Sequence, residues 1–111
     1  MDVSDVVDLA RVILKDDGQT HRWSNAQMIS FTDIAERWVL LIRPDLFLSG
    51  ASFQAVSAPT ALDDTLTVGA ETQEAMAYRV AAAALIKDDA DVSNANMAVL
   101  YQKQAKVLLN G

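Results

Sequence analysis

The sequence predicts a single domain over residues 1–111, mainly α-helical, with four helices in an antiparallel, bundle-like arrangement. A short β-hairpin or extended loop is expected between the second and third helices. Three observations support this fold class. Half of the residues are hydrophobic, at 51%, which is enough for a packed core in one domain of this length. Apolar residues recur at helical spacing in four segments, and both prolines lie between the second and the third of them.

The first helix is expected over about residues 5–15. Ser4 is one of the residue types that cap helix starts, and Asp5 and Lys15 place opposite charges where the helix dipole favours them. Gly18 follows shortly afterwards. Because glycine readily adopts the left-handed conformation that ends many helices, Gly18 is the expected stop.

The second helix is expected over residues 25–43. Ser24 and Gln27 stand three residues apart, which is the spacing of a capping box. Pro44 disfavours helical backbone at the residue before it, so the helix must end by Arg43. Apolar residues occur on nearly all sides of this helix, which predicts that it packs on more than one neighbour.

Two tryptophans accompany this helix, and each is open to a packing role and a binding role. Trp38 lies on the main apolar stripe, which favours a place in the core over a place in an interface. Trp23 directly precedes the capping serine. There a hydrophobic staple to Met28 is favoured over a role in binding.

An extended segment is expected over residues 46–70, which are rich in Ser, Thr, Gly and Pro. Residues 52–56 alternate weakly between polar and apolar types, and residues 65–68 alternate clearly. This pattern predicts two short strands joined by a turn around residues 59–64. A loop of this length between helices is often functional, so we expect it to reach a partner.

The third and fourth helices are expected over residues 71–87 and 93–109. Four consecutive alanines at 81–84 favour helix and allow other helices to approach closely. Acidic residues break the chain between the two helices, and Ser93 can cap the second of them. The expected apolar stripe of the last helix consists of Met97, Leu100 or Tyr101, Gln104 and Leu108.

The net charge of −6 is unevenly distributed. Residues 44–91 carry −6, residues 1–43 carry −2, and residues 92–111 carry +2 from Lys103 and Lys106. The acidic middle disfavours direct binding to nucleic-acid phosphates. The basic end suits an acidic partner, although Lys is also common near helix C-termini because the helix dipole favours it there.

Composition also bears on where the chain works. Cysteine is absent, which removes disulfides, thiolate nucleophiles and cysteine metal sites and fits a cytoplasmic protein. No apolar run is long enough to span a membrane. The start, Met-Asp-Val-Ser-Asp, has neither the basic nor the apolar region of a secretory signal. We therefore expect no membrane contact.

Patterns that carry catalysis or metal binding are weak. His21 is the one histidine and lies in a polar connection, which favours an exposed loop histidine over a catalytic base. A calcium-loop pattern starts at Asp89 but fails, because Asn94 stands at its glycine position and Leu100 at its glutamate position. We therefore expect no enzymatic activity, no cofactor and no metal.

Two stretches of the chain resemble small head–tail adaptor (connector) proteins of tailed bacteriophages. The first comprises residues 9–16 (LARVILKD), 23–24 (WS) and 38–45 (WVLLIRPD), and the second comprises residues 77–80 (AYRV), 87–90 (KDDA) and 101–102 (YQ). The pattern of that family is two helices, an LRPD motif, an extended segment and a helical pair with AYRA, KDAE and a late tyrosine. The resemblance covers residues 1–45 and 75–111 and leaves out residues 46–70.

This resemblance implies a virion protein of the head–tail junction, made in the host cytoplasm. Such adaptors bind under the portal protein as a ring of copies, commonly twelve, and receive the next tail or nozzle protein. The ring extends the channel through which double-stranded DNA passes without specific binding. The family implies no catalysis and no cofactor. Its third helix carries larger core residues than the alanines at 81–84, which leaves the ring size open.

The candidate interface residues fall into two groups. The C-terminal helix is expected to dock on the portal through Lys103, Lys106, Leu108 and Leu109. The loop between the second and third helices is expected to face the channel or a neighbouring subunit through Phe53, Asp63 and Asp64. An acidic lining keeps DNA from adhering to a channel through which it must slide.

A second class of function fits the same composition. A small acidic helical module can act as a regulator or inhibitor, because its carboxylates mimic nucleic acid or cover the basic site of another protein. Salt-sensitive binding to a basic protein favours this alternative, and a closed ring favours the adaptor.

Overall fold

The structure is a computed structural model that describes residues 1–16, 18–49, 52–53, 58–87 and 92–110. Within these ranges it confirms a mainly helical chain with four α-helices. They are α1 (Val3–Ile13), α2 (Asn25–Ile42), α3 (Gln73–Lys87) and α4 (Val92–Asn110). Two short 3-10 helices, η1 (Pro44–Phe47) and η2 (Ala70–Thr72), lie between α2 and α3, as do the two-residue strands β1 (Leu48–Ser49) and β2 (Ser52–Phe53).

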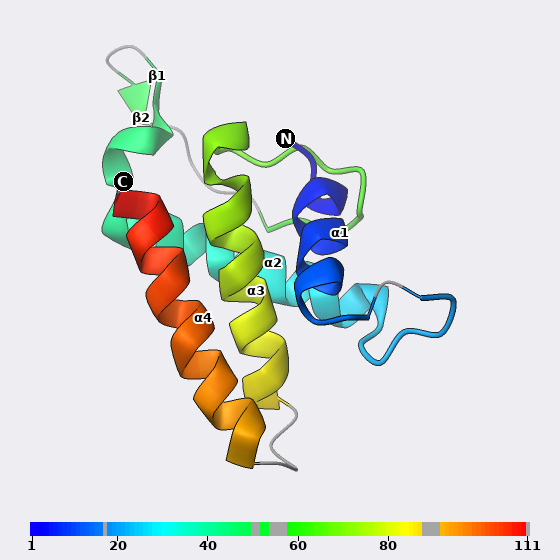
Figure 1. Cartoon of the computed structure of the whole chain (residues 1–111). Helices are drawn as coiled ribbons and strands as arrows, with labels where there is room; N and C mark the ends of the chain where they lie inside the picture. The colour runs from blue at the N-terminus through cyan, green and yellow to red at the C-terminus, as the bar shows by residue number, and fades with distance from the viewer. Residues whose placement is uncertain (17, 50–51, 54–57, 88–91, 111) are drawn as a thin grey trace.

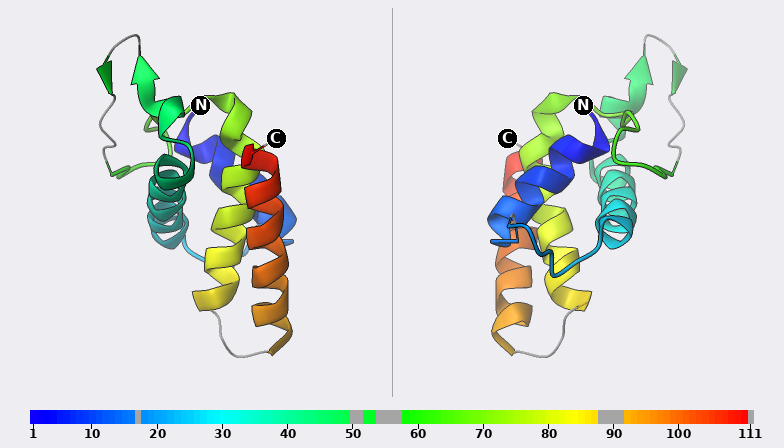
Figure 2. Two further views of the ribbon diagram at one scale, coloured as in Figure 1. Left: turned by 90° about the vertical axis from the view of Figure 1, so that its left-hand side faces the viewer. Right: turned by 90° about the vertical axis from the view of Figure 1, so that its right-hand side faces the viewer.

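The helix α3 is central and contacts the other three helices. Figure 1 shows α4 on one side of α3 and α1 on the other, with α2 crossing behind them. The helices α3 and α4 form an antiparallel pair, whereas α1 runs in the same general direction as α3. In the views of Figure 2, α2 is seen nearly end-on, because it lies across the other three helices. The molecule is therefore a helical layer crossed by one further helix, with the core between them.

Small residues allow this close packing around α3. Its buried positions include Ala75, Ala77, Ala81, Ala82 and Ala84, which present little side chain to the neighbouring helices. The facing side of α4 is also small at two of its buried positions. Among the α4 side chains that the structure describes, the buried ones are Ala98, Ala105 and Leu109.

The inward face of α4 differs from the predicted stripe. The predicted stripe was Met97, Leu100 or Tyr101, Gln104 and Leu108. Tyr101 and Leu108 do pack half-buried against the core, whereas the side chains of Met97, Leu100 and Gln104 are exposed. Ala98 lies inside instead, because α3 approaches too closely for a large residue there. The helix also begins at Val92, so Ser93 is within it and is not its cap.

The start of α1 lies two residues earlier than predicted. Asp2 is the N-cap in extended backbone, and its N–H donates to the Asp5 carboxylate at 2.9 Å, so Ser4 lies inside the helix. The end of α1 also differs, because the left-handed residue is Lys15, with φ 57°, and not Gly18. The N–H groups of Lys15 and Asp16 donate to carbonyls of the last turn, which is the Schellman pattern of helix termination.

The start and the end of α2 agree with the sequence analysis. The Gln27 N–H donates to Ser24 Oγ at 3.1 Å, and the Ser24 N–H donates to Gln27 Oε1 at 2.9 Å, which completes the predicted capping box. The helix ends at Ile42, before Pro44. Trp23 is buried in the same core cluster as Met28, as a staple requires.

The predicted pairing of residues 52–56 with 65–68 is not confirmed. The described part of residues 52–56 pairs with Leu48–Ser49, while Thr65 forms a bridge with Asp2 and the Leu66 N–H donates to the Met1 carbonyl. The physical reason lies in α1, whose first N–H groups have no acceptor within the helix. The carbonyls of Leu62 and Asp64 accept those N–H groups, which draws the loop toward the start of α1.

Candidate protein–protein interface

A groove runs between α2 and the α3–α4 pair. It consists of two adjoining hollows of about 290 and 270 Å3, which share Arg79 and Gln102. We call this surface the basic groove. Its lining residues are Phe31, Ile34 and Trp38 of α2, Arg79, Ala83, Ile86 and Lys87 of α3, and Val99, Gln102, Lys103 and Lys106 of α4.

The apolar part of the basic groove is open to solvent. Ile34, Ile86 and Val99 are 53%, 55% and 49% exposed, which is unusual for large aliphatic side chains gathered on one surface. Phe31 and Trp38 are only partly buried beside them. Covering these side chains would remove apolar surface from water, so the groove favours association with another protein surface.

The charged part of the groove is basic. Its lining includes Arg79, Lys87, Lys103 and Lys106, and no carboxylate is among the described residues that line it. The Arg79 guanidinium lies over the Trp38 ring, with Cζ 5.0 Å from the ring centroid. Burial lowers the pKa of Arg79, and no carboxylate among the described residues offsets that effect. The groove is therefore suited to an acidic partner that also carries apolar side chains.

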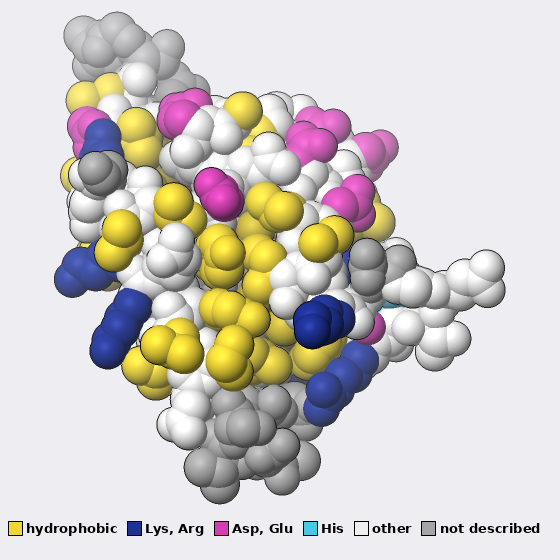
Figure 3. Space-filling model, in the orientation of Figure 1, with side chains coloured by type: hydrophobic (Ala, Val, Ile, Leu, Met, Phe, Trp, Pro, Cys, Tyr) yellow, Lys and Arg dark blue, Asp and Glu magenta, His cyan; other side chains and the backbone are white. Residues whose placement is uncertain are grey.

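A second surface has the opposite charge. We call it the acidic head, and its carboxylates are Asp2, Asp5, Asp8, Asp63, Asp64, Glu71 and Glu74. Figure 3 shows Asp and Glu side chains gathered over the end of the molecule where α1 and α3 begin. Folding brings these residues together, because the loop before α3 hydrogen-bonds to the start of α1 and Gln73 Nε2 donates to the Asp5 carbonyl.

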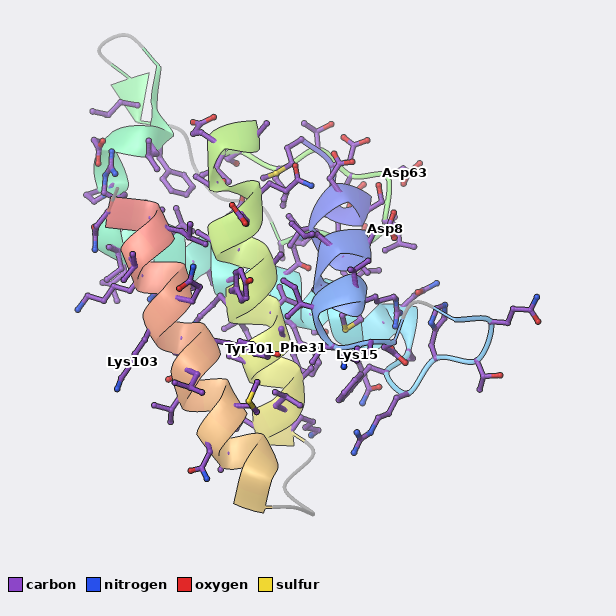
Figure 4. The ribbon with its side chains drawn as sticks, in the orientation of Figure 1. Asp8, Lys15, Phe31, Asp63, Tyr101 and Lys103 are labelled. Atoms are coloured by element: carbon purple, nitrogen blue, oxygen red, sulfur yellow. The ribbon has the colours of Figure 1, made fainter. Side chains whose placement is uncertain are left out.

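Hydrogen bonds to the backbone give two carboxylates of the acidic head a local role. Asp5 accepts the Asp2 N–H, and Asp64 accepts the N–H groups of Thr60 and Ala61. The side chains of Asp8, Asp63 and Glu74 are exposed. Figure 4 shows Asp8 and Asp63 close to each other on one side of the molecule, while Lys103 projects from α4 on the other.

The residues predicted to dock on the portal do not form one surface. Lys103 and Lys106 are exposed and line the basic groove. Leu108 is half-buried against the core, and Leu109 is buried, so the Leu109 side chain is not exposed to a partner while α4 stays packed. Helical geometry explains the division, because adjacent residues point in directions about 100° apart.

The residues predicted for the loop interface also divide. Asp63 is exposed, whereas the Asp64 carboxylate holds the turn at Thr60 and Ala61, which keeps the pKa of Asp64 below its ordinary value. The backbone of Phe53 belongs to β2, but the side chain of Phe53 lies outside the part of the structure that is described. Asp63 is therefore the loop residue that the structure leaves as a candidate contact.

A buried ion pair holds the connection between α1 and α2. Arg11 Nη1 lies 2.6 Å from Asp16 Oδ2 and also donates to the Trp23 carbonyl at 2.9 Å. The other Asp16 oxygen accepts the Arg22 N–H, and His21 Nδ1 contacts the Asp16 carbonyl oxygen at 2.9 Å. These contacts give His21 and Asp16 a structural role at the end of α1.

The IRPD stretch, one of the family-like motifs, also has a structural role. Arg43 binds Asp45 through two hydrogen bonds of 3.0 and 2.9 Å, which raises the pKa of Arg43 and lowers the pKa of Asp45. Arg43 Nη1 also donates to the Leu109 carbonyl at 2.8 Å. The motif therefore ties the end of α2 to the C-terminal turn of α4, where the helix leaves its carbonyls without partners.

Most of the basic groove is not predicted by the sequence. The signal that could have found it is a second stripe on α2, formed by Phe31, Ile34, Trp38 and Leu41 at helical spacing. The buried stripe of α2 includes Met28, Thr32, Ala35 and Val39, so Trp38, which was expected in the core, lies partly buried at its edge and lines the groove. A helix with two apolar stripes has one for the core and one for another contact.

Comparisons with known proteins give no match from which a function could be inferred. No family model, no curated protein and no solved structure matches the chain. Among the residues that the structure describes, no three His, Cys, Asp or Glu side chains gather as metal ligands. None of the helices described is long and apolar enough to cross a membrane.

Proposed function

We propose that this protein is a structural head–tail adaptor of a tailed bacteriophage. In this role copies form a ring under the portal protein and receive the next tail or nozzle protein. The ring extends the channel for double-stranded DNA without gripping it. The proposal includes neither a catalytic step nor a cofactor, and it places the protein in the virion at the head–tail junction.

One observation carries this proposal. A chain of 111 residues presents both a basic groove with exposed apolar side chains and an acidic head, on separate parts of its surface. A protein with two complementary but different surfaces can bind one neighbour on each side, which is what a ring or a stacked assembly requires. The family-like motifs at residues 9–16, 38–45 and 77–80 support the phage setting of that assembly.

The acidic head suits the environment of a DNA channel. Its carboxylates repel phosphates, so a ring that exposed part of this surface to the channel would let DNA slide. Figure 3 also shows hydrophobic side chains over α3, between α1 and α4, beneath the acidic head. That hydrophobic centre is a further surface on which a portal or tail protein can bind.

The test is the mass of the purified chain by light scattering, alone and then mixed with a portal ring from a tailed phage. An adaptor forms a stoichiometric ring on the portal, even if the free chain is largely monomeric. A chain that ignores portal rings contradicts the proposal.

The acidic head also favours the second class of function, a small regulatory or inhibitor module. Its exposed carboxylates would then cover a basic site on another protein. Such a module would bind a basic protein one to one, more weakly as salt increases, and would form no ring on a portal. The same light-scattering experiment, repeated with basic proteins at two salt concentrations, separates this function from that of an adaptor.

A further inference from the structure

Surfaces that have no role in holding the fold are free to bind partners. The buried pair Arg11–Asp16 and the IRPD stretch are both occupied by structural contacts. The basic groove differs, because its exposed side chains contribute little to the core. An occupant for the groove must therefore bring negative charge and some apolar surface.

We propose that the basic groove of one copy binds the acidic head of a second copy. This contact deepens the proposed function, on which it rests, by naming the two surfaces that join neighbouring subunits. The groove offers Arg79, Lys103 and Lys106, and the head offers Asp8 and Asp63. Opposite charges on two surfaces of one chain make that chain a partner for itself.

The outer side of α1 has a suitable shape for the groove. Asp8 and Val12 are four residues apart, so both lie on the same side of the helix, and both are exposed, Val12 at 56%. They border one hollow together with Leu62, which precedes Asp63 in the loop. A helix with an acidic and an aliphatic residue on one side can place its aliphatic residue among Ile34, Ile86 and Val99.

The Arg79 side chain gives the groove a reason to prefer carboxylates. Its guanidinium is held over Trp38 and partly removed from water, and no ion pair joins it to a carboxylate of the described residues. A carboxylate from a second copy would accept hydrogen bonds from this planar group and replace the water that it lost. Lys103 and Lys106 would surround the same carboxylate region and favour the same occupant.

The geometry makes the contact heterologous. The acidic head is built around the starts of α1 and α3, whereas the groove extends to Ile86 and Lys87 at the end of α3. Each copy therefore binds one neighbour through its groove and another neighbour through its acidic head. Such a head-to-groove contact closes into a ring or continues as a filament. This assignment gives Lys103 and Lys106 to the contact between copies and not to the portal.

A charge exchange tests the contact. The groove variant carries Lys103→Glu and Lys106→Glu, and the head variant carries Asp8→Lys and Asp63→Lys. Each variant alone places like charges at every contact, so we expect its self-association to weaken at least about tenfold relative to wild type. An equimolar mixture should recover association, because the altered groove of one variant faces the altered head of the other. Sedimentation velocity across concentration and salt measures all three samples.

A matched control keeps the change in net charge and moves it off the groove. Arg22→Glu with Arg37→Glu alters two exposed cations that line neither the groove nor the acidic head. This control should associate like wild type. Circular dichroism must show the helical spectrum in every variant, and the recovery in the mixture excludes misfolding as the cause of the loss.

Several results would overturn the proposal. In the first, the wild-type chain stays monomeric at every concentration and salt tested, and in the second, the mixture of the two variants fails to recover association. In the third, the control variant also loses association as the groove and head variants do. These outcomes are distinct from failure of the adaptor function. Copies that bind a portal ring but respond equally to all charge changes reject only the head-to-groove contact. Copies that pair by charge but ignore every portal ring reject only the adaptor.

Discussion

At the scale of single residues, Glu36 has the most unusual surroundings of the carboxylates described. It belongs to α2, its side chain is buried, and its carboxylate accepts the Thr67 N–H at 2.9 Å. Burial raises the pKa of Glu36 above its ordinary value of 4.5, and the N–H groups of Thr67 and Val68 only partly oppose that rise. Glu36 thus fastens the segment before α3 to α2, although its own desolvation opposes folding.

The raised pKa predicts how stability depends on pH. The stability that Glu36 contributes is fully present below its unfolded-state pKa and is lost as the pH rises through its higher folded-state pKa. Glu36→Gln removes the charge. We therefore expect the stability of the variant relative to wild type to increase as the pH rises from about 5 to about 7. Urea unfolding of both proteins at the two pH values measures this difference.

Asp64 provides a control with the opposite sign. The N–H groups of Thr60 and Ala61 hold its pKa below 3.8, so its contribution is present above the unfolded-state pKa and is lost as the pH falls. Asp64→Asn should therefore lower stability at neutral pH and have little effect in acid. A stability difference between Glu36→Gln and wild type that stayed constant with pH would contradict the role of Glu36.

The backbone conformation at Lys15 predicts that a glycine there stabilises the fold. Its φ of 57° is left-handed, a conformation that disfavours side chains with a Cβ atom and that glycine adopts readily. We expect Lys15→Gly to stabilise the fold by roughly 0.5–1 kcal/mol in chemical denaturation. The same substitution at Lys103, inside α4, is the control and should destabilise by about 1 kcal/mol. Equal effects at both positions would show that the backbone at Lys15 is not strained.

At the scale of helices and strands, prediction succeeded where neighbouring residues decide the structure. The capping box of α2 depends only on Ser24 and Gln27, which the sequence displays together. The pairing of Thr65 with Asp2 depends instead on N–H groups more than 60 positions away, which no local pattern reveals. The inward face of α4 was missed for a similar reason, because the alanines of α3 decide how close the helices come.

The same reasoning explains what was found of the interface. Lys103 and Lys106 stand out as the only charges near the C-terminus, and Asp63 stands out in an acidic loop. Their partners within each surface come from other elements, such as Trp38 for the groove and Asp8 for the head. A linear charge profile shows an acidic middle and a basic end. It does not show which helices fold together to make a groove.

The contacts of Arg43 predict that the end of α2 and the last turn of α4 are coupled. Its guanidinium joins the end of α2 to the Leu109 carbonyl, so Arg43→Ala should loosen the last turn of α4. Hydrogen exchange of the amides in residues 106–110 is expected to become faster, while exchange in α1 is unchanged. Asp45→Ala is the matched comparison, because it removes the ion pair and leaves the bond to α4. Exchange that was unchanged in Arg43→Ala would contradict the coupling.

At the scale of the whole molecule, the separation of charge follows the helices. α3 begins beside Glu71 and Glu74 and ends at Lys87, and α1 begins with acidic residues as well. Each of these placements suits the local helix dipole, which favours acids at helix starts and bases at helix ends. Because α1 and α3 begin at the same end of the molecule, local preferences add up to an acidic head. The basic groove arises where α3 ends beside α4.

The two neighbouring aspartates of the loop separate assembly from folding. Asp63 is exposed and belongs to the proposed contact, so Asp63→Lys should weaken self-association while Tm stays at the wild-type value. Asp64 accepts the N–H groups of Thr60 and Ala61, so Asp64→Lys should lower Tm, because a lysine cannot accept those bonds. Thermal unfolding by circular dichroism and sedimentation velocity on the same samples measure both effects.

The proposed contact would be rejected if Asp63→Lys associated like wild type. An equal loss of Tm in both variants would mean that Asp63 also holds the turn. The contrast matters because the two residues are adjacent and equally charged, so a general effect of charge on the ring would change both variants alike.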